Sequence, residues 1–269
     1  PDVVGLSIRN LDNQSFLNPV WHLPTAREIV VRTRAAGDAT IICGGPAFSI
    51  LPTECLEYLG ADVGFAGDAM ESFALLLDRV EDGEEFTDIP GVVYRSQDGG
   101  KVVVQKGRIS SDFSRPPRLD LLDIARYDKA GFGIGVVTKL ARDWYSPAGE
   151  SLYIRPVGEV IDEIRRVRED LGIRKLYFID SGFNAPLDHG KALCSALIES
   201  DMGIRWNSSL KPGDCDAELI ESMKRSGCSL VLITVPAPEL EGGDGLSERL
   251  EAARGPTHLC RQAALPFTS

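Results

Sequence analysis

Two kinds of segment alternate along the first part of the chain. Continuous apolar runs, typical of strands buried on both faces of a parallel sheet, occur at 2–8, 39–43 and 63–66. Apolar residues with helical spacing occur at 24–36, 51–59 and 70–80. This order predicts a parallel sheet whose strands are joined by crossover helices.

The alternation is interrupted in the middle of the chain. Two β-prone runs, 89–94 and 101–105, flank residues with strong turn chemistry, which predicts a β-hairpin. Residues 110–130 contain prolines and few periodic apolar positions, as expected of a linker that passes over a surface. We therefore predict a first domain at 1–109 and a second domain at 131–269.

The second domain repeats the strand and helix pattern. Strands are expected at 133–138, 175–179, 204–208, 230–235 and 266–268. Helices are expected at 157–171, 187–199, 216–226 and 247–254. Several βα units in succession predict a barrel or a large piece of one. The predicted fold class is α/β, with a partial Rossmann-like domain followed by a partial (β/α) barrel.

Composition narrows the possible functions. The 269 residues are 43% hydrophobic and 26% charged, which permits a sizeable core. The net charge of −11 argues against a nucleic-acid partner, because phosphate binding needs a concentrated basic surface. Neither a signal peptide nor an apolar run of membrane-spanning length is visible, so we expect a cytoplasmic protein. The six cysteines form no CxxC-type metal pair and are expected to be reduced thiols.

Candidate chemistry lies where the predicted strands end, because ligands of parallel sheets bind beyond the carboxyl ends of the strands. In the first domain, Gly44-Gly45 either lets a ligand approach the backbone or simply makes a turn. In the second, Asp180 either faces an active site, caps the next helix, or pairs with a neighbouring Lys or Arg. No P-loop, GxGxxG motif or nucleophilic triad is present.

The order of motifs resembles the cobalamin-binding branch of the radical S-adenosylmethionine superfamily, which includes anaerobic tetrapyrrole cyclases and hopanoid methylases. The motifs of the first domain are Val4–Asn13, Gly44–Pro52 and Leu59–Asp62. Those of the second are Gly131–Gly135, Thr138-Lys139, Val160–Glu163, Phe178–Asn184 and Met223–Cys228. The resemblance covers nearly the whole chain in the right order.

The resemblance implies cofactors and their sites. Cobalamin is expected between the two domains, in contact with Ser7, Arg9, Asn10, Asp12, Gly44, Gly45, Phe48 and Gly67. S-adenosylmethionine is expected near Asp180, Asn207 and Ser209. Family members cleave S-adenosylmethionine to a radical at a [4Fe-4S] cluster, and many then transfer a methyl group from cobalamin to carbon. An electron donor such as flavodoxin or ferredoxin would serve an active member.

The sequence departs from the family pattern at the cluster loop. Family members carry CxxxCxxC just after the first barrel strand, whereas Leu140–Gly149 follows Thr138-Lys139 here without any cysteine, and Arg142 stands where the third would lie. No metal ligands are therefore assigned. Residues 234–238 replace a Gly-then-Glu-Ser stretch, and the absence of DxHxxG leaves no histidine ligand for cobalt.

Several functions stay open. The chain is expected to be truncated at both ends relative to the family. One hypothesis is a cobalamin-dependent radical S-adenosylmethionine enzyme that performs methyl transfer or related carbon chemistry on an unknown small molecule. The alternatives are a non-catalytic cobalamin-binding or scaffold relative, and an inactive gene fragment, because the cluster cysteines are missing. Whether the chain is an enzyme is left undecided.

Overall fold

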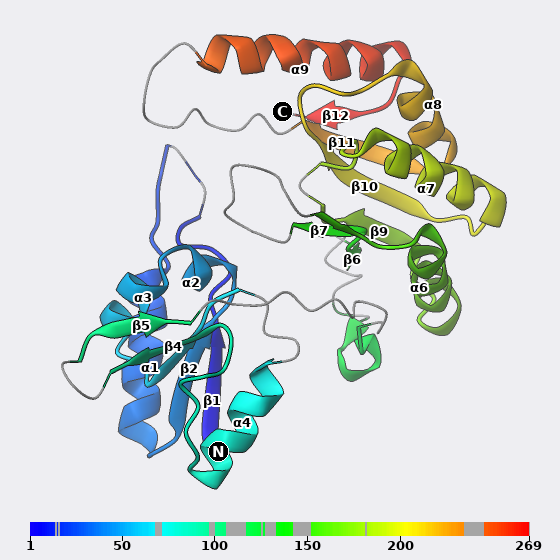
Figure 1. Cartoon of the computed structure of the whole chain (residues 1–269). Helices are drawn as coiled ribbons and strands as arrows, with labels where there is room; N and C mark the ends of the chain where they lie inside the picture. The colour runs from blue at the N-terminus through cyan, green and yellow to red at the C-terminus, as the bar shows by residue number, and fades with distance from the viewer. Residues whose placement is uncertain are drawn as a thin grey trace. The chain divides into compact units, whose positions relative to one another are not determined.

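Figure 1 shows a computed structural model of the chain. The structure describes residues 1–13, 15, 17–67, 72–96, 100–105, 117–124, 126, 133–141, 152–180, 182–233 and 245–268. The described residues up to 105 belong to one compact unit and those from 117 onward to another. The predicted domain limits at 109 and 131 lie outside the described residues and stay predictions.

The first unit is built on a sheet of five strands. In spatial order they are β1 (Val3–Ser7), β2 (Thr40–Gly44), β3 (Val63–Phe65), β4 (Val92–Arg95) and β5 (Val102–Val104). The first three strands run parallel, and β4 and β5 add as an antiparallel pair. The parallel strands and the hairpin predicted from the sequence are therefore confirmed.

Helices cover both faces of this sheet. They are α1 (Leu23–Ala36), α2 (Pro46–Ile50), α3 (Pro52–Leu59) and α4 (Ser72–Asp82). Successive residues of a strand point to opposite faces. Ile41 and Cys43 of β2 accordingly pack in the core beneath α1 and α3, whereas Ile42 packs in the core beneath α4. Two-sided covering explains why these strands have continuous apolar sequences.

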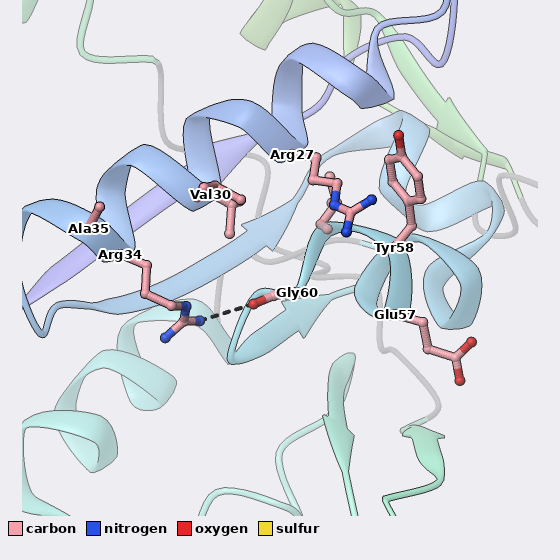
Figure 2. A pocket seen from close by; sticks show the side chains of 9 residues that line it. Arg27, Val30, Arg34, Ala35, Glu57, Tyr58 and Gly60 are labelled. Carbon is pink, nitrogen blue, oxygen red and sulfur yellow. Dashed lines mark hydrogen bonds between the residues drawn. The ribbon is translucent and has the colours of Figure 1, made fainter.

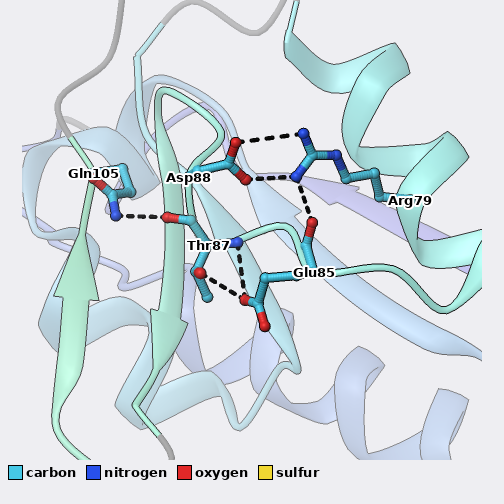
Figure 3. Close-up of polar contacts among 5 residues, drawn as sticks. All are labelled: Arg79, Glu85, Thr87, Asp88 and Gln105. Atoms are coloured by element: carbon cyan, nitrogen blue, oxygen red, sulfur yellow. Dashed lines mark hydrogen bonds and ion pairs between the residues drawn. The ribbon is translucent and has the colours of Figure 1, made fainter.

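A polar network closes the end of α4 (Figure 3). The guanidinium of Arg79 donates to the backbone oxygen of Glu85 and to the carboxylate of Asp88. That contact lowers the pKa of the Asp88 carboxyl below its usual range. Gln105 donates to the carbonyl of Thr87 and so connects the end of β5 to the same loop. These contacts position the hairpin against the parallel strands.

The second unit contains another sheet of five parallel strands. Its order is β12 (Phe267–Thr268), β11 (Cys228–Ile233), β10 (Arg205–Leu210), β9 (Lys175–Phe178) and β6 (Ile134–Val136). Each strand lies beside the next one in sequence, so right-handed crossovers place all connecting helices on one face. Those helices are α6 (Val157–Asp170), α7 (Leu187–Ser200), α8 (Ala217–Arg225) and α9 (Gly245–Gln262). The prediction of a partial (β/α) barrel is confirmed.

The two faces of this sheet differ in chemistry. On the helix side, the rings of Phe178, Phe183 and Trp206 form a buried cluster with centroids 4.9 to 5.5 Å apart. On the other face, Asn207 of β10 is in register with Tyr177 of β9. This second face therefore carries polar side chains and corresponds to the interior of a barrel.

Some elements differ from the prediction. The single helix expected at 51–59 is preceded by α2, which begins at Pro46 directly after the glycine pair. The stretch expected to be irregular after residue 138 contains β7 (Lys139–Ala141) and β8 (Leu152–Ile154), which pair antiparallel. Within the part of the chain that the structure describes, no helix is long and apolar enough to cross a membrane.

Candidate functional site

The strand ends of the first unit are joined by hydrogen bonds. The amide of Ile8 donates to the carbonyl of Gly44 at 2.8 Å, and the amide of Ala47 donates to the carbonyl of Ile8 at 2.9 Å. The hydroxyl of Ser49 donates to the carbonyl of Gly45 and accepts from the amide of Gly67, both at 2.9 Å. The structure thus brings Ser7, Gly44, Gly45 and Gly67 together at one edge of the sheet.

Ser49 was not among the predicted site residues. It lies four positions after Gly45, in the short helix α2, where a serine hydroxyl can reach the carbonyl one turn back. That spacing is visible in the sequence, but the contact with Gly67 depends on how β2 and β3 pair. The sequence therefore indicates the contact of Ser49 with Gly45, but not the contact with Gly67 that links the two loops.

Within the pair Gly44-Gly45, the second glycine is needed for backbone packing. Gly45 has φ of +98°, and a Cβ atom there would lie 2.7 Å from the carbonyl oxygen of Ile8. Gly45 is therefore required for the close approach of the loop after β1, which is the turn interpretation of this pair. Gly67 has φ of +87°, but no atom lies within 4 Å of the Cβ position. Among the predicted glycines of this region, Gly67 is the one whose backbone faces open space.

Other predicted cobalamin residues occupy different environments. The side chain of Phe48 is fully buried, with its ring against Gly64, so its packing role is explained without a ligand. Arg9 is exposed and Asn10 is half-buried after the end of β1. Asp12 forms a β-bridge with Trp21 across a closed loop. Their contact with cobalamin stays a prediction.

In the second unit, Asp180 is buried and has well-defined partners. Its carboxylate accepts hydrogen bonds from the amide of Thr138, at 3.0 Å, and from the hydroxyl of the same residue. The ammonium of Lys139 lies 3.9 Å from Asp180 and donates to the carbonyl of Phe183 at 3.2 Å. Pairing of Asp180 with a neighbouring lysine, one of the predicted alternatives, is thus present. Its contact with S-adenosylmethionine stays a prediction.

Lys139 is an unusual lysine because it is buried. Its pKa is lowered to about 8, chiefly by burial; the charge of Asp180 acts in the opposite direction, and the charge of Lys211 adds to the lowering. The sequence indicated Thr138-Lys139 as a strand end, but burial of the side chain depends on β7 and could not be read from the residue order.

Asn207 and Ser209 lie two residues apart on the helix-free face of β10. The amide oxygen of Asn207 accepts from the hydroxyl of Ser229 at 2.8 Å. The hydroxyl of Ser209 lies 3.3 Å from the hydroxyl of Tyr177 on β9. These four polar side chains come from three adjacent strands, and they could bind the polar groups of a ligand on that face.

The segment after the first barrel strand forms a hairpin base. Its backbone continues from Thr138 into β7, which pairs with β8. Arg155, just after β8, donates from its amide to the carbonyl of Thr138 at 3.0 Å and from its guanidinium to the carbonyl of Val137 at 2.7 Å. Its guanidinium also forms a buried 2.7 Å ion pair with Glu163 of α6. Residues 142–151, including Arg142, lie outside the described residues.

The cysteines do not fit a [4Fe-4S] cluster. None occurs between Cys55 and Cys194, so this hairpin contains none. Five cysteines are buried and Cys215 is half-buried, and burial raises the pKa of Cys43 to about 12. Cluster ligation needs accessible thiolates grouped around the metal. In the described residues, no three His, Cys, Asp or Glu side chains are grouped to hold a metal ion.

A groove on the surface of the first unit is separate from these strand ends (Figure 2). It has a volume of about 360 Å³ and lies between α1 and α3. Its lining residues are Arg27, Val30, Val31, Arg34, Ala35, Glu57, Tyr58, Leu59 and Gly60. Arg34 donates to the carbonyl of Gly60, where α3 ends. Since α3 ends before β3 begins, this part of the groove lies toward the amino ends of the strands.

Comparison with solved structures decides the fold. A radical S-adenosylmethionine methyltransferase, TsrM from Kitasatospora setae, superposes with a TM-score of 0.77 and 20% identity, over 99% of this chain and 56% of that one. The cobalamin-dependent S-adenosylmethionine radical enzyme OxsB superposes with a TM-score of 0.73 and 14% identity, over 99% of this chain and 40% of that one. This chain has the fold of cobalamin-dependent radical S-adenosylmethionine enzymes. The resemblance inferred from motif order is confirmed at the level of fold.

Curated sequences agree with this result. The chain is 22% identical to cytidylyl-2-hydroxyethylphosphonate methyltransferase of Streptomyces wedmorensis, over 87% of this chain. It is 21% identical to an uncharacterised methyltransferase of Pyrococcus horikoshii, over 86% of this chain. The chain spans 50% of the length of each of these relatives. No protein-family model matches it.

Proposed function

We propose that this chain binds cobalamin and S-adenosylmethionine as part of a protein related to methyltransferases that act on small organic molecules. The observation that carries the proposal is the likeness of fold over 99% of the chain to TsrM and OxsB, solved structures that hold these cofactors. TsrM has been solved with cobalamin and a [4Fe-4S] cluster, and with a tryptophan substrate and an analogue of S-adenosylmethionine; OxsB has been solved with aqua-cobalamin and S-adenosylmethionine.

Cobalamin would meet the strand ends of the first unit. When bound, it supplies a methyl group on cobalt that can be transferred to another atom. Gly67 would allow close approach, because the space beside its backbone is open. Ser7, at the end of β1, and Arg9 and Asn10, in the loop after it, would supply hydrogen-bond donors. Ser49 would hold the two neighbouring loops in place through its bonds to Gly45 and Gly67.

S-adenosylmethionine would lie on the polar face of the second sheet. The hydroxyls of Tyr177 and Ser209 and the amide of Asn207 can bind its ribose and amino-acid groups. Asp180 would act from the carboxyl end of β9, where it is already oriented by Thr138. A small substrate and, for a redox-active protein, an electron donor such as flavodoxin or ferredoxin complete this proposal.

A second candidate function follows from the missing cysteines. Because no cysteine lies between Cys55 and Cys194, and the described residues contain no group of three potential metal ligands, reductive cleavage of S-adenosylmethionine is not assigned to this chain. A cobalamin-binding relative without radical chemistry is then the alternative. Anaerobic reconstitution with iron and sulfide separates the two: a four-iron signal in electron paramagnetic resonance supports the radical enzyme, and its absence supports the second candidate.

Cobalamin binding can be tested directly. The purified chain is mixed with hydroxocobalamin and desalted, and the visible spectrum of the protein fraction is recorded. We expect bound cobalamin, and we expect Gly67→Val to weaken binding about tenfold or more, equivalent to ~1.4 kcal/mol, because the new side chain fills the open space. A protein fraction without a cobalamin spectrum would contradict the proposal.

Gly83→Val is the matched control. Gly83 also has a positive φ, +67°, and no atom within 4 Å of its Cβ position, but it follows α4 and not a strand end. Both substitutions should therefore cause similar backbone strain. Equal loss of cobalamin in the two variants would assign the effect to stability and remove Gly67 from the site.

A further inference from the structure

Three basic side chains, two lysines and a histidine whose imidazole is neutral near pH 7, lie at the carboxyl ends of β6, β9 and β10 in the second unit. We call Lys139, His189 and Lys211 the cationic cluster. Lys139 begins β7, His189 is in the first turn of α7, and Lys211 directly follows β10. All three lie beside the segment that follows β9. Lys139 donates to the carbonyl of Phe183 at 3.2 Å, Lys211 packs over Gly182, and His189 precedes Gly190, whose Cβ position is 2.9 Å from the same carbonyl. Lys211 also lowers the pKa of Lys139, and Lys139 lowers that of His189. Burial is the larger cause of both shifts.

Within the described residues, one carboxylate lies within ion-pair distance of the cationic cluster. Asp180 faces Lys139 at 3.9 Å, but its carboxylate already accepts two hydrogen bonds from Thr138. Lys191, farther along α7, is neutralised by Asp216 and Glu218 at 2.6 and 2.5 Å. Among the described residues, the two lysines of the cationic cluster thus have one carboxylate, Asp180, within ion-pair distance, in a chain whose net charge is −11. Unmatched charge near a protein interior is costly unless a counter-charge binds.

The cluster also has unused hydrogen-bonding groups. Lys139 is 7% exposed and, within the described part of the chain, donates one hydrogen bond, to the carbonyl of Phe183, although an ammonium carries three donors. The Nε2 atom of His189 is buried and has no hydrogen-bond partner among the described residues. Buried polar atoms normally have partners, so this atom is available to a bound group.

Lys211 is held in position at the exposed side of the cluster. The side-chain amide of Asn184 accepts from the amide of Lys211 at 2.9 Å and donates to its carbonyl at 3.0 Å. The aliphatic part of Lys211 lies over Gly182, where a Cβ atom would be 2.6 Å from its Cγ. Gly182 therefore leaves space for the lysine side chain, whose ammonium is exposed to solvent.

We propose that the cationic cluster binds a small oxyanion, the carboxylate or phosphate group of a substrate. Lys139 and His189 would contact it from the protein side and Lys211 from the solvent side. His189 is in the first turn of α7, and the positive amino end of the helix dipole also favours a bound anion. The link to a substrate rests on the proposed function, whereas binding of the anion itself requires no cofactor.

Histidine NMR of the 269-residue chain tests this proposal. The chain has three histidines, His22, His189 and His258, so each imidazole resonance can be assigned by substitution. Inorganic phosphate or acetate replaces chloride at constant ionic strength. We expect the His189 resonance to shift saturably and the pKa of His189 to rise, while His22 and His258 do not respond. Phosphate and acetate in separate titrations show which oxyanion is preferred.

Three variants distinguish a specific anion site from general screening of charge by salt. Lys211→Gln removes an exposed charge and should weaken anion binding about three- to tenfold without unfolding the protein. Lys191→Gln on α7 is the matched control and should leave binding unchanged, because Lys191 is paired with Asp216 and Glu218. Lys139→Met should weaken binding at least about tenfold, provided that histidine chemical shifts show an intact fold.

The outcomes separate clearly. No saturable shift, an equal response of all three histidines, or equal effects of Lys211→Gln and Lys191→Gln would overturn the proposal. Because the experiment contains no cobalamin, S-adenosylmethionine or iron, its failure leaves the proposed cofactor binding intact. Conversely, anion binding by a chain that does not retain hydroxocobalamin would support the cationic cluster and contradict the proposed function.

Discussion

The strand ends of the two units are built in different ways. Among the residues that the structure describes, every buried polar or charged side chain belongs to the second unit: Thr138, Lys139, Arg155, Glu163, Asp180, Asn184, Ser208, Ser209 and Ser226. The strand ends of the first unit are instead joined mainly by backbone groups around glycines. The backbone conformation at glycines therefore determines how the strand ends of the first unit are arranged. In the second unit, buried polar and charged side chains determine it.

The covering of the two sheets explains this difference. Helices cover both faces of the first sheet, so its strand residues are apolar and only the loops beyond the strands can meet a ligand. The connecting helices of the second sheet lie on one face, and the other face carries Tyr177, Asn207 and Ser209. A ligand there can be bound along the strands as well as at their ends.

The largest effect is expected from breaking the buried ion pair of the second unit. Glu163→Ala should lower the free energy of unfolding by about 3–5 kcal/mol, because the guanidinium of Arg155 would stay buried without its counter-charge. Chemical denaturation with far-ultraviolet circular dichroism measures the change. A loss below ~1 kcal/mol would show that charge pairing does not govern this region.

A neighbouring pair on α6 provides the control. Asp162 forms an ion pair with Arg165 at 2.6 Å, but both side chains are exposed. Asp162→Ala should therefore change stability by no more than about 0.5 kcal/mol. Replacing Arg155 and Glu163 together by methionine should recover much of the lost stability, since paired buried charges can be exchanged for apolar groups at little cost.

Sequence reasoning predicted the elements with strong periodicity and missed those that depend on tertiary contact. The parallel strands and their helices follow from apolar spacing, and Asp180 was found because it ends an apolar strand. β7 and β8 were missed because they flank a stretch with Arg142, Asp143, Pro147 and Gly149, which the sequence indicates as irregular. Glu163 was missed as a buried residue because a charged side chain on a helix is usually exposed.

The spacing of apolar residues along α6 nevertheless indicates that Glu163 is buried. Val160, Ile164 and Val167 form its apolar face, and Glu163 precedes Ile164 on the same side of the helix. Its partner Arg155 lies outside the helix, so the pairing could not be derived from periodicity. The resemblance of motif order located the strand ends correctly, whereas the ligand contacts of individual residues remain predictions.

An intermediate effect is expected from the backbone of the first unit. Gly45→Ala should destabilise the protein by about 2–4 kcal/mol, because it combines an unfavourable φ of +98° with overlap between Cβ and the backbone of Ile8. Gly67→Ala, with φ of +87° but open space, should cost only about 1 kcal/mol. Thermal unfolding of the two variants checks the difference, and equal losses would show that the close approach at Gly45 is unimportant.

The smallest effect, taken per pH unit, is the pH dependence of stability contributed by Lys139. Its sign is opposite to that of a lysine whose pKa is raised by an ion pair. Burial lowers the pKa of Lys139 to about 8 in the folded chain, whereas the ordinary value of a lysine is 10.5. Between these values the unfolded chain holds a proton that the folded chain has released, so this group makes the free energy of unfolding rise with pH. The slope is at most ~1.4 kcal/mol per pH unit and vanishes below pH 8 and above pH 10.5.

Comparison with Lys139→Met isolates this contribution from the other titrating groups. The buried cysteines act in the opposite direction, because burial raises the pKa of thiols such as Cys43 and Cys194 to about 12, and stability is then lost as the pH rises above their unfolded value of 9.0. Urea denaturation of both proteins at several pH values gives the difference. The wild type should gain stability relative to the variant between pH 8 and 10.5. A difference that does not depend on pH would mean that Lys139 is solvated in the folded chain. The buried charges among the described residues of the second unit would then be Asp180 and the Arg155–Glu163 pair.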